Sequence, residues 1–402
     1  MNPSLVGSEM CIRDRVCMNT TVQNLLGTNY KTYIVLFLCA LIIGIKLGTL
    51  IPLLALILEA RGYSNTEIGL NVVAQPLAVI LFVRITPIII HKIGLAKSII
   101  IAQIFTIILY FTFPIFDSLT AWFVIRFIIG FAGALAWNAF DTWMLSMADD
   151  TNRGKIVTIY NTVFVIGFAS GPMVLSLTGI EGWLPFIVIS SLSFIAILPL
   201  IMLEIEDPKL PDKKSLPVFA AIIAAPTIFG AAILCGLDDV MFVSFFPIFM
   251  IKNQFTQEIA LQYVTITLVG GVMCQPLIGV LLDKFNKRLL LNIAVLITFF
   301  CPILFAIYLD NFYVMAASCF IWGGAASGLF AISLTMLGER YSASQVAGAT
   351  AILVMVFEVG SLIGPLIGGR VMDAVGPMGF IYTVTSFTFI FLVISIYRTI
   401  WR

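Results

Sequence analysis

The sequence YIVLFLCALIIGIKLGTLIPLLALIL, residues 33–58, decides the fold class of this chain. Lys46 is the only charged residue in this apolar run, and a helix of roughly 20 apolar residues can cross the hydrocarbon core of a bilayer. Similar runs recur as far as Trp401. With 60% hydrophobic and 11% charged residues, the chain of 402 residues carries more apolar surface than a soluble core could bury. The sequence therefore predicts an all-α membrane protein.

Twelve transmembrane helices are expected, separated by short segments that contain charged residues, proline or glycine. Their predicted ranges are 33–58, 66–90, 98–116, 119–146, 156–178, 183–203, 219–251, 259–282, 288–308, 312–337, 347–372 and 377–397. The longest polar stretch, EIEDPKLPDKKSLP, divides them into two sets of six. We therefore expect an N-terminal six-helix bundle at 18–203, a cytoplasmic linker at 204–217 and a C-terminal six-helix bundle at 218–402. Residues 1–17 resemble a translated adapter sequence and are expected to be non-native.

The basic residues between the spans predict their orientation, because cytoplasmic loops carry an excess of lysine and arginine. With the N-terminus inside, the outer side receives Arg61, Lys252 and Arg370. The cytoplasmic side receives sixteen, namely Arg13, Arg15, Lys31, Lys92, Lys97, Arg153, Lys155, Lys209, Lys213, Lys214, Lys284, Lys287, Arg288, Arg340, Arg398 and Arg402. An odd number of spans would scramble this alternation. We therefore expect both termini in the cytoplasm and a location in the prokaryotic plasma (inner) membrane.

The two sets of six spans repeat each other at a spacing of 193 residues. At this spacing Gly130 falls on Gly323, and Thr142 falls on Thr335. The pair Gly171-Pro172 falls on Gly364-Pro365 in the same way. A register shared over several spans predicts two bundles related by a pseudo-twofold axis.

The most specific motif is GVLLDKFNKR, residues 279–288, between the eighth and ninth predicted spans. It resembles the cytoplasmic signature G-x-x-x-D-[RK]-x-G-[RK]-[RK] of the major facilitator superfamily, with Asn286 in place of the second glycine. The matching residues are Gly279, Asp283, Lys284, Lys287 and Arg288. Through the resemblance we assign them to a cytoplasmic gating motif, in which Gly279 permits close helix approach, Asp283 pairs with cations and Asn286 tolerates a left-handed turn. The equivalent loop after the second span has Pro87 and His91 instead of the glycine and the aspartate.

Glycine-rich motifs extend the resemblance into spans 4, 5 and 11. RFIIGFAGA in span 4 resembles the arginine motif of that family, and GFASGP in span 5 resembles its G-x-x-x-G-P motif, which span 11 repeats. The residues concerned are Arg126, Gly130, Gly133, Gly167, Gly171, Pro172, Gly360, Gly364 and Pro365. Small residues four apart allow close helix packing, and proline bends a helix. Packing alone and a hinge for alternating access remain two interpretations of these motifs.

Six of the charged residues inside predicted spans are of most interest, because a lipid-facing position would cost about 3 kcal/mol each. They are Lys46, Arg126, Asp141, Asp238, Asp239 and Glu358. They must therefore face the bundle interior or a wet cavity, and the resemblance implies that spans 1, 4, 7 and 10 line such a cavity. Asn138 shares a helix face with Asp141. We expect these seven residues to form a substrate or proton pathway; fixed ion pairs that orient helices are the alternative.

Lys46 and Asp239 correspond under the repeat, so we hypothesise that they pair in one conformation. Adjacent helical residues point about 100° apart, so one of Asp238 and Asp239 should face the cavity and the other a neighbouring helix. Glu358 lies in an apolar stretch, which would suit proton carriage.

The resemblance implies a secondary active transporter that moves a small organic solute, and the buried carboxylates favour proton coupling. The chain contains no G-x-x-x-x-G-K-[ST] nucleotide motif, and one histidine gives no histidine-ligated metal centre. A net charge of +1 without a basic stripe argues against nucleic acid as a partner. We therefore expect a monomer in the lipid bilayer with no enzymatic activity, cofactor or metal. A polytopic membrane enzyme and a transporter-like sensor or scaffold are the alternatives.

Overall fold

The computed structural model describes residues 30–147, 153–202 and 217–400, and every regular element in these ranges is an α-helix. The helices are α2 (Tyr30–Ala60), α3 (Asn65–Phe82), α4 (Thr86–Ile93), α5 (Leu95–Tyr110), α6 (Leu119–Met147), α7 (Arg153–Thr178), α8 (Leu184–Met202), α9 (Val218–Ala224), α10 (Pro226–Lys252), α11 (Gln257–Lys284), α12 (Lys287–Ile307), α13 (Phe312–Arg340), α14 (Ala343–Val375) and α15 (Gly379–Ile400). The predicted non-native segment 1–17 and residues 204–216 of the predicted linker lie outside the described residues.

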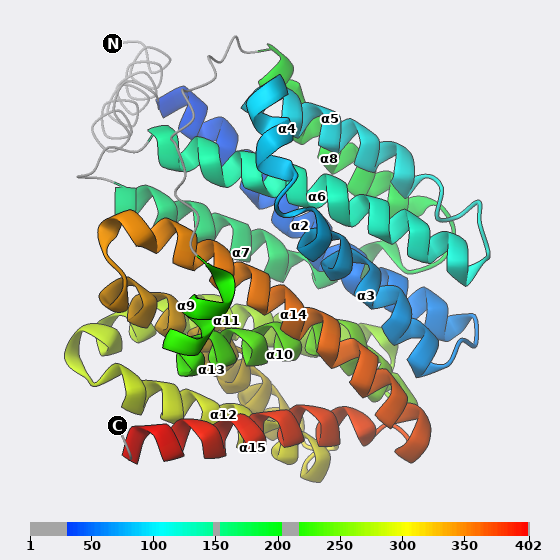
Figure 1. Cartoon of the computed structure of the whole chain (residues 1–402). Coiled ribbons are helices and arrows are strands. Elements are labelled where there is room, and N and C mark those ends of the chain that lie inside the picture. Colours follow the sequence, from blue (N-terminus) through cyan, green and yellow to red (C-terminus); the bar gives the residue numbers. More distant parts are fainter. Residues whose placement is uncertain (1–29, 148–152, 203–216, 401–402) are drawn as a thin grey trace, which may run out of the picture.

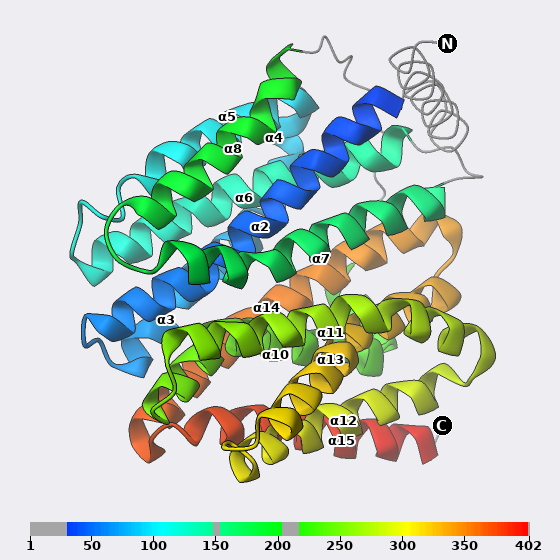
Figure 2. The same ribbon diagram turned by 180° about the vertical axis from the view of Figure 1, so that it is seen from behind.

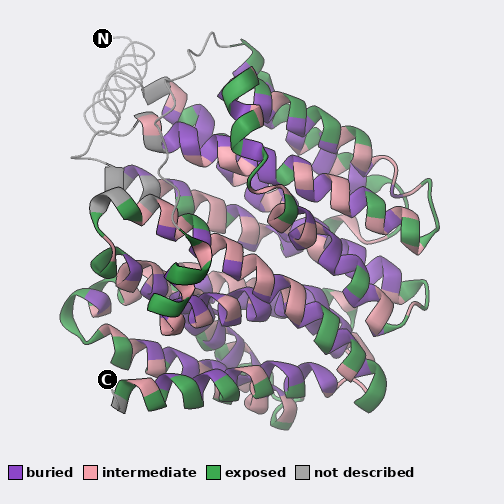
Figure 3. Ribbon diagram, in the orientation of Figure 1, coloured by how far each residue is buried: buried purple, intermediate pink, exposed green. Residues whose placement is uncertain are grey.

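Within the described residues, eleven helices are long and apolar enough to cross a membrane, or twelve if the bent pair α4 and α5 counts as one span. Large apolar side chains such as Leu177 and Met202 are exposed on the outside of the bundle (Figure 3). In water this surface would be unfavourable, whereas lipid chains solvate it. The prediction of an all-helical integral membrane protein is confirmed.

Two predicted spans are interrupted where proline breaks the helix. The predicted span 66–90 ends as α3 at Phe82, and α4 begins at Thr86 with Pro87 in its first turn. A proline at 87 disfavours continuation of the preceding helix, because it has no amide hydrogen and its ring crowds the carbonyl four residues earlier. Helix α4 then meets α5 at a bend of 116°. The predicted span 219–251 is divided in the same way into α9 and α10, immediately before Pro226.

The predicted repeat is visible in the helices themselves. Helices α6 and α13 begin 193 residues apart, at Leu119 and Phe312. Their packing repeats as well: α2 packs against α7 in the first half, as α10 packs against α14 in the second. These two contacts are among the most extensive in the molecule, so the same helix–helix interface is built twice.

The two halves meet along three pairs of helices, α3 with α14, α7 with α11, and α2 with α10. Figure 1 shows α14 crossing α3, and Figure 2 shows α7 beside α11. Helices α2 and α15 place the described chain ends at one end of the bundle, which we call the termini face (Figure 1). The loops after α2, α10 and α14 lie at the other end, the opposite face.

Candidate functional site

Lys46 is buried inside the N-terminal half, with 4% of its surface exposed. Its Nζ donates a hydrogen bond of 2.5 Å to Gln103 Oε1 on α5, and it lies 5.6 Å from the centre of the Tyr110 ring. The amide oxygen and the ring face both attract a cation. Gln103 and Tyr110 therefore satisfy Lys46 within its own half. Nothing in the sequence pattern singles out Gln103, because a glutamine in an apolar span is unremarkable.

The predicted ion pair between Lys46 and Asp239 is absent from this conformation, in which both residues are described. Lys46 points to α5, on the side of α2 that packs within the N-terminal half. Equivalent positions in the repeat do not therefore bring the two side chains together here. Asp239, in the other half, is only partly buried.

Arg126 on α6 is also buried inside the N-terminal half, with 2% of its surface exposed. One of its terminal nitrogens donates a hydrogen bond of 3.1 Å to Asn71 Oδ1 on α3. Its Nε and the Asn71 Nδ2 group have no hydrogen-bond partner within the described chain. The arginine thus links two helices of one half through a neutral side chain, with part of its hydrogen-bonding capacity unused.

Asn138 and Asp141 lie on the same stretch of α6 but contact different helices. Asn138 Nδ2 donates a hydrogen bond of 2.8 Å to Thr86 Oγ1 at the start of α4. The carboxylate of Asp141 accepts a hydrogen bond from the Tyr160 hydroxyl on α7. Both predicted polar residues are partly exposed, and each joins α6 to another helix of the N-terminal half.

Three carboxyl groups gather in the C-terminal half, on α10 and α14. Asp238 is fully buried, and neither of its oxygens has a hydrogen-bond partner among the described residues. Asp239 and Glu358 are partly exposed and lie close enough to interact electrostatically. Neither makes a hydrogen bond or an ion pair within the described chain. The adjacent aspartates differ in exposure: Asp238 is fully buried, whereas Asp239 is partly exposed. Which of them faces a cavity stays a prediction.

Five of the predicted small residues lie where two helices touch. An added methyl group at Gly130 would lie 2.6 Å from the Gln75 carbonyl oxygen, and one at Gly364 would lie 2.9 Å from that of Leu237. At Gly167, Gly171 and Gly360 it would overlap the facing backbone of α2 or α10. Only glycine permits these approaches. Pro172 and Pro365 stand inside α7 and α14, one residue after Gly171 and Gly364.

The expected close approach is absent at two other glycines. Gly133 and Gly279 are exposed, and a methyl group on either would meet nothing within 4 Å. No neighbouring helix comes near either of them in this conformation. The packing interpretation of Gly133 and Gly279 is therefore wrong for this structure.

The 279–288 motif differs in two details from what its residues suggested. Asp283 is exposed and forms no ion pair in the described part of the chain. Asn286 has φ −63°, outside the left-handed region, and instead caps α12 by accepting hydrogen bonds from the Arg288 and Leu289 amides. An Asn side chain at this position satisfies free amides of the first helical turn. Lys287 forms an ion pair of 2.6 Å with Glu339 on α13.

Several aromatic side chains of α10, α13 and α15 pack against one another. Phe242, Phe246 and Trp322 are buried, and the ring centres of Phe246 and Trp322 lie 4.5 Å and 4.6 Å from that of Phe242. Phe249 and Phe380 extend the same cluster. These rings fill the core of the C-terminal half and are not available to a solute. No group of three or more His, Cys, Asp or Glu residues in the described ranges is placed to hold a metal ion.

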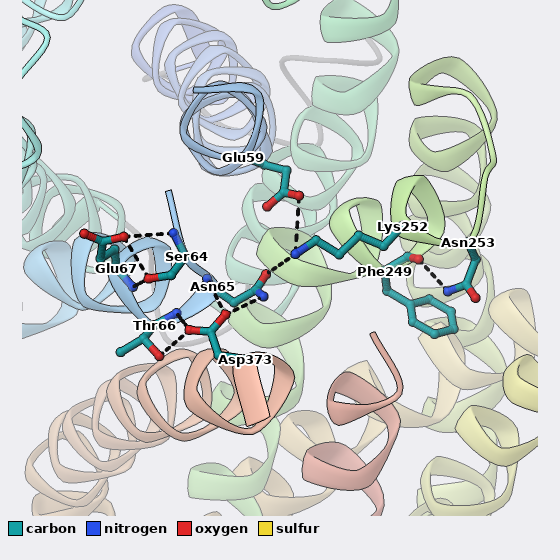
Figure 4. A network of polar contacts seen from close by, with 9 residues as sticks. All are labelled: Glu59, Ser64, Asn65, Thr66, Glu67, Phe249, Lys252, Asn253 and Asp373. Carbon is teal, nitrogen blue, oxygen red and sulfur yellow. Dashed lines mark hydrogen bonds and ion pairs between the residues drawn. The ribbon is translucent and has the colours of Figure 1, made fainter. Parts of the chain in front are cut away.

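A second polar cluster joins the two halves at the opposite face (Figure 4). Asp373, near the end of α14, accepts two hydrogen bonds of 2.8 Å at one oxygen, from the Asn65 amide and side chain. Its other oxygen accepts from the Thr66 amide at 2.8 Å and from the Thr66 hydroxyl at 2.5 Å. The Asp373 carboxylate therefore caps the N-terminus of α3, where free amides and the helix dipole favour a negative charge.

Lys252 adds a second link between the halves beside Asp373 (Figure 4). Its Nζ lies 3.4 Å from Glu59 Oε1 on α2 and donates a hydrogen bond of 3.2 Å to Asn65 Oδ1. Behind these residues, Gly69 and Gly369 allow α3 and α14 to touch backbone to backbone. The opposite face is thus closed by polar contacts over a tight helix crossing. Sequence reasoning missed this cluster, because Asp373 and Asn65 are 308 residues apart.

Comparisons with known proteins agree with this architecture. The sequence profile of the "Major Facilitator Superfamily" matches residues 36–227 and 228–401. The "Uncharacterized MFS-type transporter YfkF" of Bacillus subtilis (strain 168) is 24% identical over 359 residues, which cover 88% of this chain and 92% of that protein. The "Uncharacterized MFS-type transporter YcaD" of Escherichia fergusonii is 22% identical over 276 residues, covering 68% of this chain and 71% of that protein.

Solved structures share the fold. The nucleoside transporter NupG superposes with a TM-score of 0.73 at 18% identity, covering 92% of this chain and 98% of that one. A D-xylose-proton symporter superposes with a TM-score of 0.74 at 14% identity, covering 91% of this chain and 97% of that one. With two related bundles, the glycine motifs at their helix contacts and a profile that spans nearly the whole described chain, this protein belongs to the Major Facilitator Superfamily.

Proposed function

We propose that this chain is a secondary active transporter that moves a small organic solute by alternating access, with protons as the coupling ion. The observation that carries the proposal is the pair Asp239 and Glu358, two carboxyl groups within the membrane that are partly exposed and have no hydrogen-bond or ion-pair partner in the described chain. An ionised side chain inside the membrane costs free energy, so an unpaired carboxyl group at such a position indicates a substrate or proton pathway. Binding a proton would remove its charge without any other rearrangement.

The closed opposite face supports the alternating-access part of the proposal. Asp373 and Lys252 tie the halves together at that face only through side chains and one helix end. Such contacts can break without unfolding a helix, so the two bundles can rock against each other. The intramembrane cations Lys46 and Arg126 instead bond neutral side chains inside their own half, which suits a rigid bundle.

Uptake into proteoliposomes tests the proposal. A panel of labelled solutes begins with nucleosides and pentoses, since the names of two similar folds mention a nucleoside and D-xylose. An inside-alkaline pH gradient should drive accumulation in the wild type. A membrane enzyme would convert the solute instead of concentrating it.

The variants Asp239→Asn and Glu358→Gln, singly and together, locate the proton site. We expect gradient-driven accumulation to fall to the level without a gradient, while exchange of labelled for unlabelled solute continues, because exchange needs no net proton movement. Glu181→Gln is the control: it removes one negative charge from an exposed residue in the loop after α7. It should leave gradient-driven accumulation unchanged. Full gradient-driven accumulation in the double variant would refute proton coupling at these residues.

A further inference from the structure

A hollow of about 470 Å³ opens at the termini face of the C-terminal half, away from the intramembrane carboxyl groups. It lies where the α9–α10 junction, the start of α12 and the ends of α13 and α15 converge. Four basic residues line it, Lys287, Arg288, Arg340 and Arg398, against the single acidic residue Glu339.

Among the described residues, the basic side chains of this hollow outnumber its acidic ones. Glu339 is engaged by Lys287 at 2.6 Å. The guanidinium groups of Arg288 and Arg340 make no ion pair or side-chain hydrogen bond within the described chain. The hollow therefore carries an excess of positive charge, and guanidinium groups present paired donors that match the oxygens of a phosphate.

Two long helices begin at the same hollow, α10 at Pro226 and α12 at Lys287. Asn286 already caps α12. At α10 the cap is missing: Ala225 makes no side-chain cap, and the Thr227 amide and hydroxyl have no hydrogen-bond partner in the described residues. Free amides and the helix dipole add to the attraction for an anion.

We propose that this hollow binds a phosphate group, held by Arg288 and Arg340 and oriented by the amide and hydroxyl of Thr227. Its volume falls within the range of small-molecule sites, so a phosphate ester larger than the bare ion fits. Phe285, Ile228 and Met336 provide an apolar wall for the rest of the molecule. The ligand is either the headgroup of an anionic lipid in the adjoining leaflet or a soluble phosphate ester. This site lies away from the intramembrane carboxyl groups of the proposed pathway, and it includes Arg288 of the 279–288 motif.

The test compares three variants of the full chain with the wild type. Arg288→Gln with Arg340→Gln removes both guanidinium groups. Arg288→Lys with Arg340→Lys keeps the positive charge but loses the paired donors of the guanidinium group. Lys92→Gln with Lys97→Gln is the matched control, because it removes two exposed cations from the termini face of the other half. All four proteins are checked for folding by their thermal unfolding curves.

One arm uses native mass spectrometry to measure how many lipid molecules remain bound to the protein after purification from nanodiscs of phosphatidylglycerol or of phosphatidylcholine. The other arm measures the melting temperature in phosphatidylcholine nanodiscs with inorganic phosphate or glycerol 3-phosphate. If the hollow binds phosphate, we expect the double glutamine variant to bind its phosphate ligand roughly thirtyfold more weakly than the wild type. The double lysine variant should lose less affinity, and the control should bind like the wild type.

The arms distinguish the two sources of phosphate. Arginine-dependent retention of phosphatidylglycerol without a response to soluble phosphate identifies the lipid headgroup. An arginine-dependent rise in melting temperature with glycerol 3-phosphate identifies a soluble ester. Equal binding by the wild type and the double glutamine variant in both arms, or an equal loss in the control, would overturn the proposal.

Discussion

Lys46 and Asp238 illustrate two ways in which the membrane interior holds an ionisable side chain. Lys46 has an amide oxygen and an aromatic ring as partners, and both belong to α5 of its own half. Asp238 is equally buried but has no partner at either oxygen within the described residues. The sequence could predict that both are inside the bundle, because lipid exposure is costly. It could not predict the partners, since these depend on how α2 and α10 are rotated against their neighbours.

The buried bond between Lys46 and Gln103 predicts a measurable cost when its acceptor is removed. Gln103→Leu leaves the cation buried without its acceptor, and we expect the free energy of unfolding to fall by about 3 kcal/mol. The variant Lys46→Met with Gln103→Leu removes both polar groups and should recover most of that loss. Thermal unfolding in detergent measures both effects. A melting temperature of Gln103→Leu equal to that of the wild type would show that the bond contributes nothing.

At the scale of the helices, nearly every helix could be predicted from the sequence, but the two interruptions of predicted spans could not. Proline marks both interruptions, at Pro87 and Pro226, yet each lies within a stretch that was predicted as a single span. The glycine pattern found the contact between α2 and α7 and that between α10 and α14, because a missing side chain is required where backbones touch. It failed at Gly133, which is exposed and has no neighbouring helix within reach.

The difference between these glycines gives a matched pair of substitutions. Gly360→Ala places a methyl group against the Ile233 carbonyl oxygen of α10. We expect a loss of roughly 1–3 kcal/mol from overpacking and weaker α10–α14 packing. Gly133→Ala meets no atom within 4 Å, so it should be neutral or gain up to about 1 kcal/mol of helix propensity. Melting temperatures compare the two, and equal effects of both substitutions would contradict the assigned contact.

At the scale of the whole molecule, the two halves repeat the same helix packing and meet along three pairs of helices. The spacing of 193 residues predicted this repeat, and the first residues of α6 and α13 match it. The closure at the opposite face could not be predicted. In the sequence Asp373 is an ordinary charged residue near a helix end, and its role appears only when α14 is placed across the start of α3.

If alternating access is correct, the Asp373 contacts hold one of two arrangements of the halves. Asp373→Asn keeps the shape of the side chain but removes its charge. The hydrogen bonds that the charged carboxylate accepts from Asn65 and Thr66 are weakened or lost, which should destabilise this arrangement by about 3 kcal/mol in total. Glu67→Gln is the matched control. Glu67 belongs to the same cluster, but it bonds only Ser64 within its own helix start (Figure 4).

Double electron–electron resonance on spin-labelled protein in nanodiscs tests the account most directly. One label pair spans the halves at the opposite face, at Glu181 and Asp310, and the other spans them at the termini face, at Lys92 and Gly338; all four positions are exposed. Cys11, Cys17 and Cys274 are first replaced by serine. We predict that Asp373→Asn lengthens the opposite-face distance and shortens the termini-face distance, while Glu67→Gln leaves both as in the wild type. Unchanged distances in Asp373→Asn, or a lengthening at both faces together, would contradict alternating access by two rocking halves.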